Sequence, residues 1–278
     1  MRVLVGTDGS AASRAALRWA EALVDADGGD LVVAAVRVAP FAEVWPETIE
    51  ERRAIESERL DEACAAIRGS HVQHRALLLE GDPREQLLKA AEAEHADQIV
   101  TGARGSGGHR HPLHMGSTTH HLVHHTRVPL IAVPASARAA WPAPIVVGVD
   151  GSDGSASAVR WLTSHGLALT ADVIAVHAEK PLAQWVPSSD PHSWYHMALD
   201  RMQPWVAPLR ECGLGARSLV IDGDPVDAMT DVAISEAAGL IIVGARGTGG
   251  ITGLRLGSTA LKVLHQAQVP VLMVPADM

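Results

Sequence analysis

Two glycine-rich segments hold the residues of this sequence that are best suited to bind an anion. Residues 102–108 read Gly-Ala-Arg-Gly-Ser-Gly-Gly, and residues 244–250 read Gly-Ala-Arg-Gly-Thr-Gly-Gly. Glycine has no Cβ, so its backbone can approach a phosphate closely, and the free N–H groups at a helix N-terminus favour a negative charge. Each segment therefore predicts a phosphate site. The alternative is a glycine turn that only joins two elements.

A Gly-Ser-Thr triplet follows each glycine segment and adds hydroxyl donors to the same region. An apolar run that is typical of a buried strand, 97–101 or 240–243, comes before each segment, and an apolar helical pattern such as 261–264 comes after. Each segment is therefore expected to connect a strand to a helix N-terminus. The triplets are Gly116, Ser117 and Thr118 in the first case and Gly257, Ser258 and Thr259 in the second.

The glycine segments belong to a repeat that covers most of the chain. Gly244 follows Gly102 by 142 positions, and residues 5–10 recur at 147–152 with the same offset. The apolar ending at 128–134 recurs at 269–275 with an offset of 141. One extra residue must therefore lie in the first half, between Gly105 and Gly116.

Length and composition indicate two globular domains. The 278 residues divide into domains at 1–135 and 144–278, joined by a Pro- and Ala-rich linker at 136–143. No apolar run approaches the roughly 18 residues that span a bilayer, and a strand pattern begins directly after Met1. The net charge is -9 with three lysines, which argues against a nucleic-acid surface. We expect a cytoplasmic protein that binds neither membrane nor nucleic acid.

Strand and helix patterns alternate in both halves, which predicts parallel sheets with helices on both faces. The predicted fold is α/β, with two tandem Rossmann-like domains, each a five-stranded parallel sheet of order 3-2-1-4-5. The expected strands are 3–6, 31–38, 72–79, 98–101, 128–133, 145–149, 172–178, 217–221, 240–243 and 269–274. The expected helices are 11–26, 47–68, 83–94, 117–126, 155–167, 194–212, 225–236 and 258–267.

This strand order places a crevice at the carboxyl ends of the first and fourth strands, where the winding direction reverses. Asp8 and Gly102 lie at these ends in the first half, and Asp150 and Gly244 in the second. Two motifs that are distant in sequence thus converge on one expected ligand site in each half.

The motifs together resemble the universal stress protein family, in its tandem, ATP-binding form. The resemblance covers both halves nearly end to end, and it includes the Gly-x-Asp-Gly-Ser start, the Gly-Asp-Pro before the third helix and the Val-Pro ending. The family signature G-x2-G-x9-G-[ST] is matched by Gly244, Gly247, Gly257 and Ser258, whereas the first half has ten residues in the last interval. The resemblance implies an adenine nucleotide alpha hydrolase-like fold.

The resemblance also implies ATP, alone or with Mg²⁺, as the ligand. Asp8 and Asp150 would contact the adenosine, and Val38 and Ala178 would offer backbone groups to the adenine. The remaining expected binding residues are strand-end residues and phosphate-holding residues of the glycine segments and triplets: Gly6, Thr7, Gly148, Val149, Gly102, Arg104, Gly105, Gly116, Ser117, Thr118, Gly244, Arg246, Gly247, Gly257, Ser258 and Thr259.

Binding without useful turnover is the favoured activity, as in a nucleotide-dependent stress-response regulator. The sequence has no G-x-x-x-x-G-K-[ST] motif, no G-x-S-x-G elbow and no lysine near either glycine segment, so no catalytic residue is assigned. A weak ATPase or phosphotransferase is the rival interpretation. A structural dimer that has lost nucleotide binding in its first half is the third.

The fifth strands suggest how the halves assemble. Residues 128–133 and 269–274 are apolar edge strands, and an exposed edge invites pairing with another strand. We expect the halves to pair through these strands about a pseudo-twofold axis, with a homodimer of whole chains and an unknown regulatory protein as further partners. Trp45 and Trp185, each in the loop after a second strand, are expected nearest the nucleotide.

Seven of the 15 histidines fall within residues 109–125. The pairs His120/His124 and His121/His125 have i, i+4 spacing, which puts each pair on one helix face and suits Zn²⁺ or Ni²⁺. No carboxylate or thiolate lies close in sequence, so packing or surface histidines are favoured and no metal site is expected. Phosphate contact or a pH response from His109, His111 and His114 is the alternative.

The two nucleotide sites are expected to be unequal, with the second half binding ATP more tightly. The extra residue of the first half lies in its phosphate segment, where Pro112 also removes one N–H donor. The corresponding segment of the second half has Gly253 and the family spacing.

Overall fold

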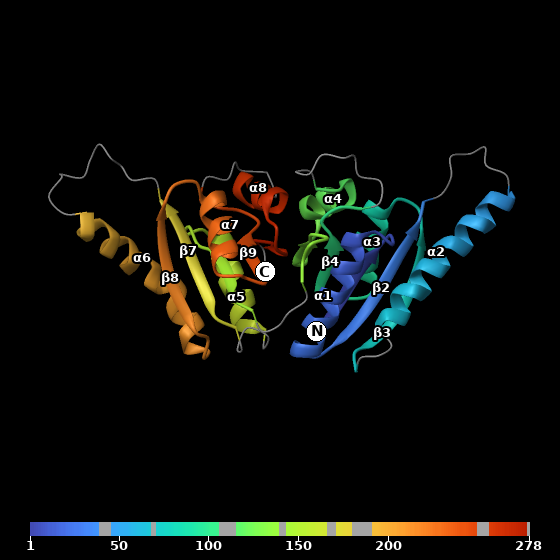
Figure 1. The fold of residues 1–278 in the computed structure, drawn as a ribbon, viewed down its shortest axis with the longest axis horizontal. Coiled ribbons are helices and arrows are strands. Elements are labelled where there is room, and N and C mark those ends of the chain that lie inside the picture. Colours follow the sequence, from blue (N-terminus) through green and yellow to red (C-terminus); the bar gives the residue numbers. More distant parts are fainter. Residues whose placement is uncertain are drawn as a thin grey trace. The chain divides into compact units, whose positions relative to one another are not determined.

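Strands and helices alternate throughout the described residues. A computed structural model describes residues 1–38, 46–67, 71–105, 115–138, 143–165, 171–179, 191–248 and 256–276. The chain divides into two units, Met1–Ala140 and Trp141–Met278, so the boundary falls within the segment expected to be a linker. The fold is therefore an α/β Rossmann-like fold with two tandem domains (Figure 1).

Within its described residues, the first unit has five parallel strands. Strand β1 pairs with β2 and β4, β2 also pairs with β3, and β4 also pairs with β5. Its elements are β1 (Arg2–Thr7), α1 (Ala11–Asp27), β2 (Asp30–Arg37), α2 (Pro46–Ile67), β3 (Gln73–Glu80), α3 (Pro83–Ala93), β4 (Gln98–Gly102), α4 (Ser117–His125) and β5 (Leu130–Val133).

The second unit repeats this arrangement. Strand β6 pairs with β7 and β9, β7 also pairs with β8, and β9 also pairs with β10. Its elements are β6 (Ile145–Gly148), α5 (Asp153–Ser164), β7 (Val173–Glu179), α6 (Pro191–Glu211), β8 (Ala216–Asp222), α7 (Pro225–Ser235), β9 (Leu240–Gly244), α8 (Ser258–Gln266) and β10 (Val271–Val274).

Helices cover both faces of the strands in each unit. In the first unit α1 packs beside α2 and α3 beside α4, and in the second unit α5 packs beside α6 and α7 beside α8. The central strands are buried on both sides, which is why they read as continuous apolar runs: Val3, Leu4 and Val5 are fully buried. Trp19 and Trp161 occupy matching buried places on α1 and α5.

Several element boundaries differ by one to three residues from the sequence prediction, and two of these differences have identifiable reasons. Helix α5 begins at Asp153, two residues earlier than expected, because the Ser152 hydroxyl caps it by accepting from the Ser155 N–H at 3.2 Å. Strand β5 begins at Leu130 and not at residue 128, since Pro129 has no N–H to donate to a ladder.

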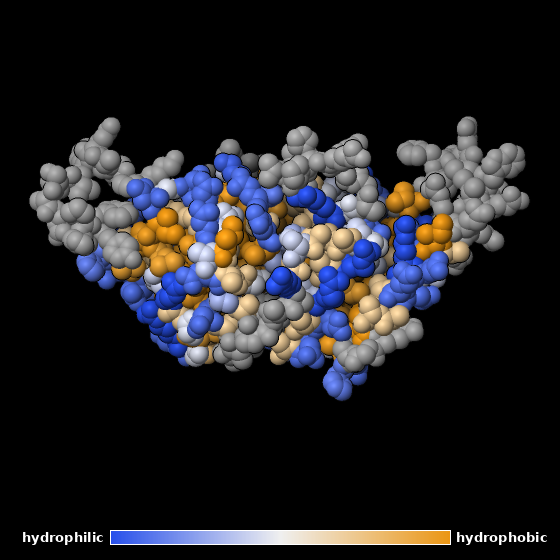
Figure 2. All heavy atoms as spheres, viewed as in Figure 1, coloured by the Kyte–Doolittle hydropathy of each residue, from blue (hydrophilic) through white to orange (hydrophobic). Residues whose placement is uncertain are grey.

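No described helix is long and apolar enough to cross a membrane. Hydrophilic and apolar side chains are interspersed on the surface shown in Figure 2. The large apolar side chains found exposed among the described residues are Val38, Ile55, Met197 and Ile234, which come from separate elements. Scattered apolar side chains of this kind are ordinary on protein surfaces.

Candidate functional site

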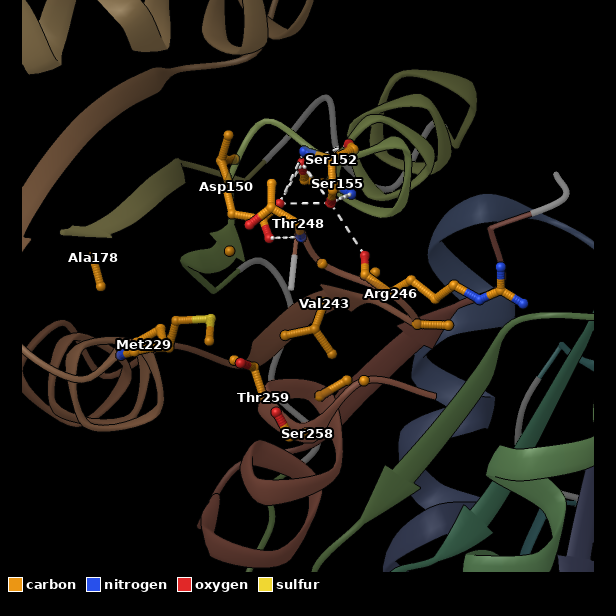
Figure 3. Close-up of a pocket in the computed structure, with 18 of the residues that line it drawn as sticks. Asp150, Ser152, Ser155, Ala178, Met229, Val243, Arg246, Thr248, Ser258 and Thr259 are labelled. Atoms are coloured by element: carbon orange, nitrogen blue, oxygen red, sulfur yellow. Dashed lines mark hydrogen bonds between the residues drawn. The ribbon is translucent and has the colours of Figure 1, made fainter. Parts of the chain in front are cut away.

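A cavity of about 260 Å³ opens in the second unit at the carboxyl ends of β6, β7 and β9 (Figure 3). All ten residues that the sequence analysis assigned to this half line it. They are Gly148, Val149, Asp150, Ala178, Gly244, Arg246, Gly247, Gly257, Ser258 and Thr259. The fold therefore brings together residues from four separate stretches of sequence.

The carboxylate of Asp150 is held by four hydrogen bonds. Its Oδ1 accepts from the Ser152 N–H at 3.0 Å, the Ser152 hydroxyl at 2.5 Å and the Ser155 hydroxyl at 3.2 Å. Its Oδ2 accepts from the Thr248 N–H at 2.9 Å. Dashed lines in Figure 3 mark these contacts, which connect the Asp-Gly-Ser turn after β6 to the glycine segment after β9.

These donors keep Asp150 ionised. Burial alone would raise the pKa of Asp150, but the hydrogen bonds from Ser152, Thr248 and Ser155 outweigh burial and lower it below the ordinary value. The residue remains exposed at the mouth of the cavity, so solvent screening limits what this shift contributes to stability. The cavity thus presents a carboxylate whose position is fixed by its neighbours.

The glycines of the segment are required by close contacts. A Cβ on Gly247 would lie 2.5 Å from the Asp150 Oδ2, and a Cβ on Gly244 would lie 2.2 Å from the Gly154 carbonyl carbon. Both distances are shorter than a side chain can tolerate without displacing its neighbour. The segment can therefore follow its path beside Asp150 only with glycine at these two positions.

Helix α8 presents its N-terminus to the cavity. The Gly257 N–H donates to the Ala245 carbonyl at 2.7 Å, which fixes the start of the helix beside β9. Gly257 is the N-cap, and no described side chain caps the helix. Ser258 and Thr259 line the cavity, so first-turn N–H groups and two hydroxyls are available to an anion.

Arg246 borders the cavity with its backbone. Its carbonyl oxygen lies 3.1 Å from the Ser152 hydroxyl oxygen, whose single proton is shared with the closer Asp150, while Figure 3 shows its guanidinium extending away from Asp150 and Ser258. Its expected contact with a phosphate stays a prediction.

Further lining residues were not singled out from the sequence. Val176, Pro225, Met229, Val243 and Ala260 form an apolar wall. Met229 lies one turn after Pro225 on α7, so the Gly-Asp-Pro motif was the signal that pointed to this wall. Ser152 and Ser155 were also missed as donors to Asp150, although both follow the aspartate within five residues.

The first unit repeats the backbone of this site. The Ser10 N–H donates to the Asp8 Oδ1 at 3.0 Å, and the Gly116 N–H donates to the Ala103 carbonyl at 2.8 Å. A Cβ on Gly105 would lie 2.7 Å from the Asp8 Oδ2, and one on Gly102 would lie 2.8 Å from the Ser13 nitrogen. Asp8, Gly102, Gly105 and Gly116 therefore stand in the relation seen in the second unit.

The other residues that the sequence analysis assigned to the first site lie in different local surroundings. Gly6 faces the Leu87 side chain, and the buried Thr7 hydroxyl donates to the Ser13 hydroxyl at 3.4 Å. Ser117 and Thr118 begin α4, as Ser258 and Thr259 begin α8, and Arg104 is exposed.

One wall of the first site is polar where the second is apolar. Thr119 donates its hydroxyl to the Gly102 carbonyl at 2.8 Å and lies 3.3 Å from the Thr101 hydroxyl. The corresponding residues of the second unit are Val243 and Ala260, both of which line the cavity. The two sites therefore differ in chemistry as well as in segment length.

The register of β2 corrects one predicted pairing of residues. Gly6 is aligned with Ala34 in the first unit as Gly148 is aligned with Val176 in the second. Two residues further along each strand stand Val36 and Ala178, so Val36 is the counterpart of Ala178. Val38, which the sequence analysis placed in the strand, follows the end of β2 and is 56% exposed, while its adenine contact stays a prediction.

Some sequence predictions fall outside the described residues. These are the inserted stretch 106–114, with His109, His111, Pro112 and His114, and the loop residues Trp45 and Trp185.

The histidines of α4 are described. His121 and His125 have stacked rings with centroids 4.0 Å apart, and burial, followed by the nearby His125 and Arg84, lowers the pKa of His121. Within the described ranges, no group of three or more His, Cys, Asp or Glu side chains is arranged around a common metal position.

The sequence of this chain matches a known protein family over both units. The family model described as "Universal stress protein family" matches residues 1–134 and again 143–275. The chain is 27% identical to Universal stress protein Rv1996 and 29% identical to Universal stress protein Rv2005c, both from Mycobacterium tuberculosis. The two matches cover 99% and 98% of this chain, respectively, and 96% of each relative.

A solved structure has the same fold over the whole chain. The crystal structure of a universal stress protein from Archaeoglobus fulgidus superposes with a TM-score of 0.75 at 19% identity, covering 99% of this chain and 98% of that one. Since the family model matches both units almost completely, the chain belongs to the universal stress protein family.

Proposed function

We propose that this protein is a nucleotide-dependent regulator of the stress response that binds ATP in the cavity of its second unit. The observation that carries the proposal is that all ten residues named from the sequence for this half line one cavity. Four of them, Gly244, Gly247, Gly257 and Ser258, are the complete family signature.

The donors of the cavity suit the phosphates of a nucleotide. The glycine segment lets backbone N–H groups approach an anion, and the N-terminus of α8 adds N–H groups and the Ser258 and Thr259 hydroxyls. Hydrogen bonds from such groups to a charged phosphate are each worth about 1.5–3 kcal/mol. This donor set fits a polyphosphate.

The apolar wall suits the base. Met229, Val243 and Val176 offer a surface on which a planar ring can be buried, and Ala178 lies at the same end of β7. An apolar pocket with a few converging polar groups is the usual form of a small-molecule site. An adenine nucleotide therefore matches both parts of the cavity.

We further propose that Mg²⁺ arrives with the phosphates and is not held by Asp150 alone. The carboxylate already accepts four hydrogen bonds, three of them on Oδ1. Its role is to fix the turn and the glycine segment in position for the nucleotide.

Regulation, and not turnover, is the activity that this site supports. None of the described lining residues is a lysine, and the lining carboxylate Asp150 is engaged by Ser152, Ser155 and Thr248. Besides the Mg²⁺ that accompanies the nucleotide, a catalyst of phosphoryl transfer needs protein groups that stabilise the outer phosphates and orient the attacking oxygen. Weak ATP hydrolysis or phosphotransfer is the rival. Phosphate release above background that disappears in Asp150→Ala would favour that rival.

The first unit is proposed to hold a weaker site or none. Its backbone follows that of the second unit, but the polar pair Thr101 and Thr119 replaces part of the apolar wall. A unit that has lost nucleotide binding and only contributes to assembly is the corresponding alternative.

The assembly is proposed from the sequence. β5 and β10 are short apolar strands that could pair, so that the five strands of each unit would form half of one longer sheet. A homodimer, a regulatory protein partner and a cytoplasmic location complete the proposal. An experimental structure in which β5 and β10 lie far apart would contradict the pairing.

The direct test is to identify the small molecule that is bound to the purified protein. The chain is denatured, and released small molecules are identified by mass spectrometry for the wild type, Gly247→Ala and Gly105→Ala. We expect adenine nucleotide from the wild type and from Gly105→Ala, and a loss in Gly247→Ala, whose Cβ would collide with Asp150. Equal nucleotide in both variants would contradict the assignment to the second unit.

A further inference from the structure

Helix α4 carries four histidines in two pairs one turn apart. The rings of His121 and His125 are stacked, with centroids 4.0 Å apart and an interplanar angle of 17°. The ring centroids of His120 and His124 lie 4.6 Å apart, with an interplanar angle of 36°. Two imidazoles this close on one helix face can both reach a single ion by rotation about their side-chain bonds.

A hydrogen bond determines which ring nitrogen of His125 carries the proton. Its Nδ1 lies 2.8 Å from the His121 carbonyl oxygen. Because a carbonyl only accepts, Nδ1 carries the proton, and the neutral ring keeps its lone pair on Nε2. Metal-binding histidines are commonly oriented in this way, with the second nitrogen bonded to a backbone carbonyl.

The surroundings of this pair are balanced in charge. Arg84, on the neighbouring helix α3, forms an ion pair with Asp82 at 2.5 Å, so the carboxylates of Asp82 and Glu85 offset part of its charge near His121. Glu85 lies in the same first turn of α3. His125 is exposed and His121 is half-buried, so an ion from solvent can reach the pair.

The second unit shows that the fold does not require these histidines. The residues of α8 that correspond to His121 and His125 are Lys262 and Gln266. The same helix therefore forms in the same place without an imidazole pair. The pair is a property of the first unit and is independent of the nucleotide site proposed in the second.

We propose that His121 and His125 form a two-imidazole site for a divalent transition-metal ion, with water in the remaining coordination positions. Imidazole ligands favour Cu²⁺, Ni²⁺ and Zn²⁺ over Mg²⁺ and Ca²⁺, which prefer oxygen. This chemistry is distinct from the oxygen ligands of a nucleotide-bound Mg²⁺. The site is open to solvent and exchangeable, and it differs from a closed structural centre with four protein ligands.

The experiment is a calorimetric titration of the untagged full chain with NiCl₂ at pH 7.5. The test variant is His121→Lys/His125→Gln, which places the residues of the second unit on the same helix. His71→Gln is the control, because His71 is exposed and lies before β3, away from α4 in sequence. Thermal unfolding of both variants establishes that they are folded.

We expect saturable binding by the wild type, an affinity at least about tenfold weaker in the double variant, and no change in the control. Titration followed by nuclear magnetic resonance of the histidine ring nitrogens should show the His121 and His125 signals moving first. Three results would overturn the proposal: no saturable binding by the wild type, a double-variant affinity within threefold of the wild type, or other histidine signals moving first.

Discussion

The Thr248 N–H donates a hydrogen bond to the Asp150 carboxylate at 2.9 Å, although the two residues are 98 positions apart in sequence. Asp150 follows β6 and Thr248 follows β9, the two strands at which the winding of the second unit reverses. One carboxylate therefore holds together both motifs that line the cavity.

Loss of this carboxylate should have a larger effect on the free energy of ATP binding than on the free energy of unfolding. In Asp150→Ala the glycine segment loses its anchor, and we expect ATP affinity to fall about ten- to hundredfold, as for the loss of one charge-assisted hydrogen bond. The free energy of unfolding should fall by only about 1 kcal/mol, because the site is exposed. Asp153→Ala, one turn away on α5, is the control; an equal loss of ATP affinity there would contradict this role.

The charge of Asp82 should stabilise the first unit above about pH 4. Its carboxylate caps α3 by accepting from the Arg84 N–H at 2.9 Å, and hydrogen bonds from the Arg84 side chain and backbone lower the pKa of Asp82 from 3.8 to about 2. The unfolded chain binds this proton more readily, so the contribution is complete above the unfolded pKa and is lost as pH falls toward 2.

The matched variants Asp82→Ala and Asp224→Ala measure that contribution. Each should lower the free energy of unfolding by about 1 kcal/mol through the lost cap. Asp82→Ala should lose up to about 1 kcal/mol more, since Asp224 caps Val226 and has no arginine two residues later. Urea unfolding at pH 7 and pH 3 checks this; a larger effect of Asp82→Ala at pH 3 than at pH 7 would refute it.

Gln98 should be a destabilising residue in the core of the first unit. It is fully buried at the start of β4, and neither of its amide atoms has a hydrogen-bond partner among the described residues. The corresponding residue of the second unit is Leu240, also fully buried. We expect Gln98→Leu to raise the free energy of unfolding by about 1–3 kcal/mol and Leu240→Gln to lower it. A lower urea midpoint for Gln98→Leu would show that the amide is satisfied.

The two nucleotide sites should bind ATP unequally. Gly247→Ala removes the second site and leaves the first, with its extra residue and polar wall, whereas Gly105→Ala leaves the second. At pH 8 we expect the second site to bind about ten- to a few thousand-fold more tightly, which corresponds to about 1.5–5 kcal/mol. Protonation of the histidines in the inserted stretch should reduce the difference at pH 6. Equal affinities of the two variants at pH 8 would rule this out.

The repeat and the apolar runs predicted the fold closely because buried parallel strands leave a continuous apolar signature. Glycines at 244 and 247 were informative for the same physical reason: only glycine fits beside Gly154 and Asp150. The strand register was harder to predict. Val38 is apolar and extends the pattern of β2, but pairing with β3 ends at Arg37, so the predicted end of the strand was one residue too late.

Side-chain hydrogen bonds were the other part that sequence could not supply. Ser152 and Ser155 bond to Asp150 because α5 starts at the turn that carries them, and Thr119 reaches Gly102 because the first turn of α4 lies beside the end of β4. Such contacts depend on the angle at which a helix meets a strand. The spacing of motifs predicts that the helix is there but not which hydroxyl reaches which oxygen.

The central claim is that the cavity of the second unit binds ATP. Calorimetric titration of nucleotide-free protein with ATP and Mg²⁺ tests it most directly, with Gly247→Ala as the variant and Thr163→Ala, on the solvent side of α5, as the control. The account predicts saturable binding by the wild type and the control, and a loss of the tightest site in Gly247→Ala. Saturable binding that is unchanged in Gly247→Ala, or no binding by the wild type, would contradict it.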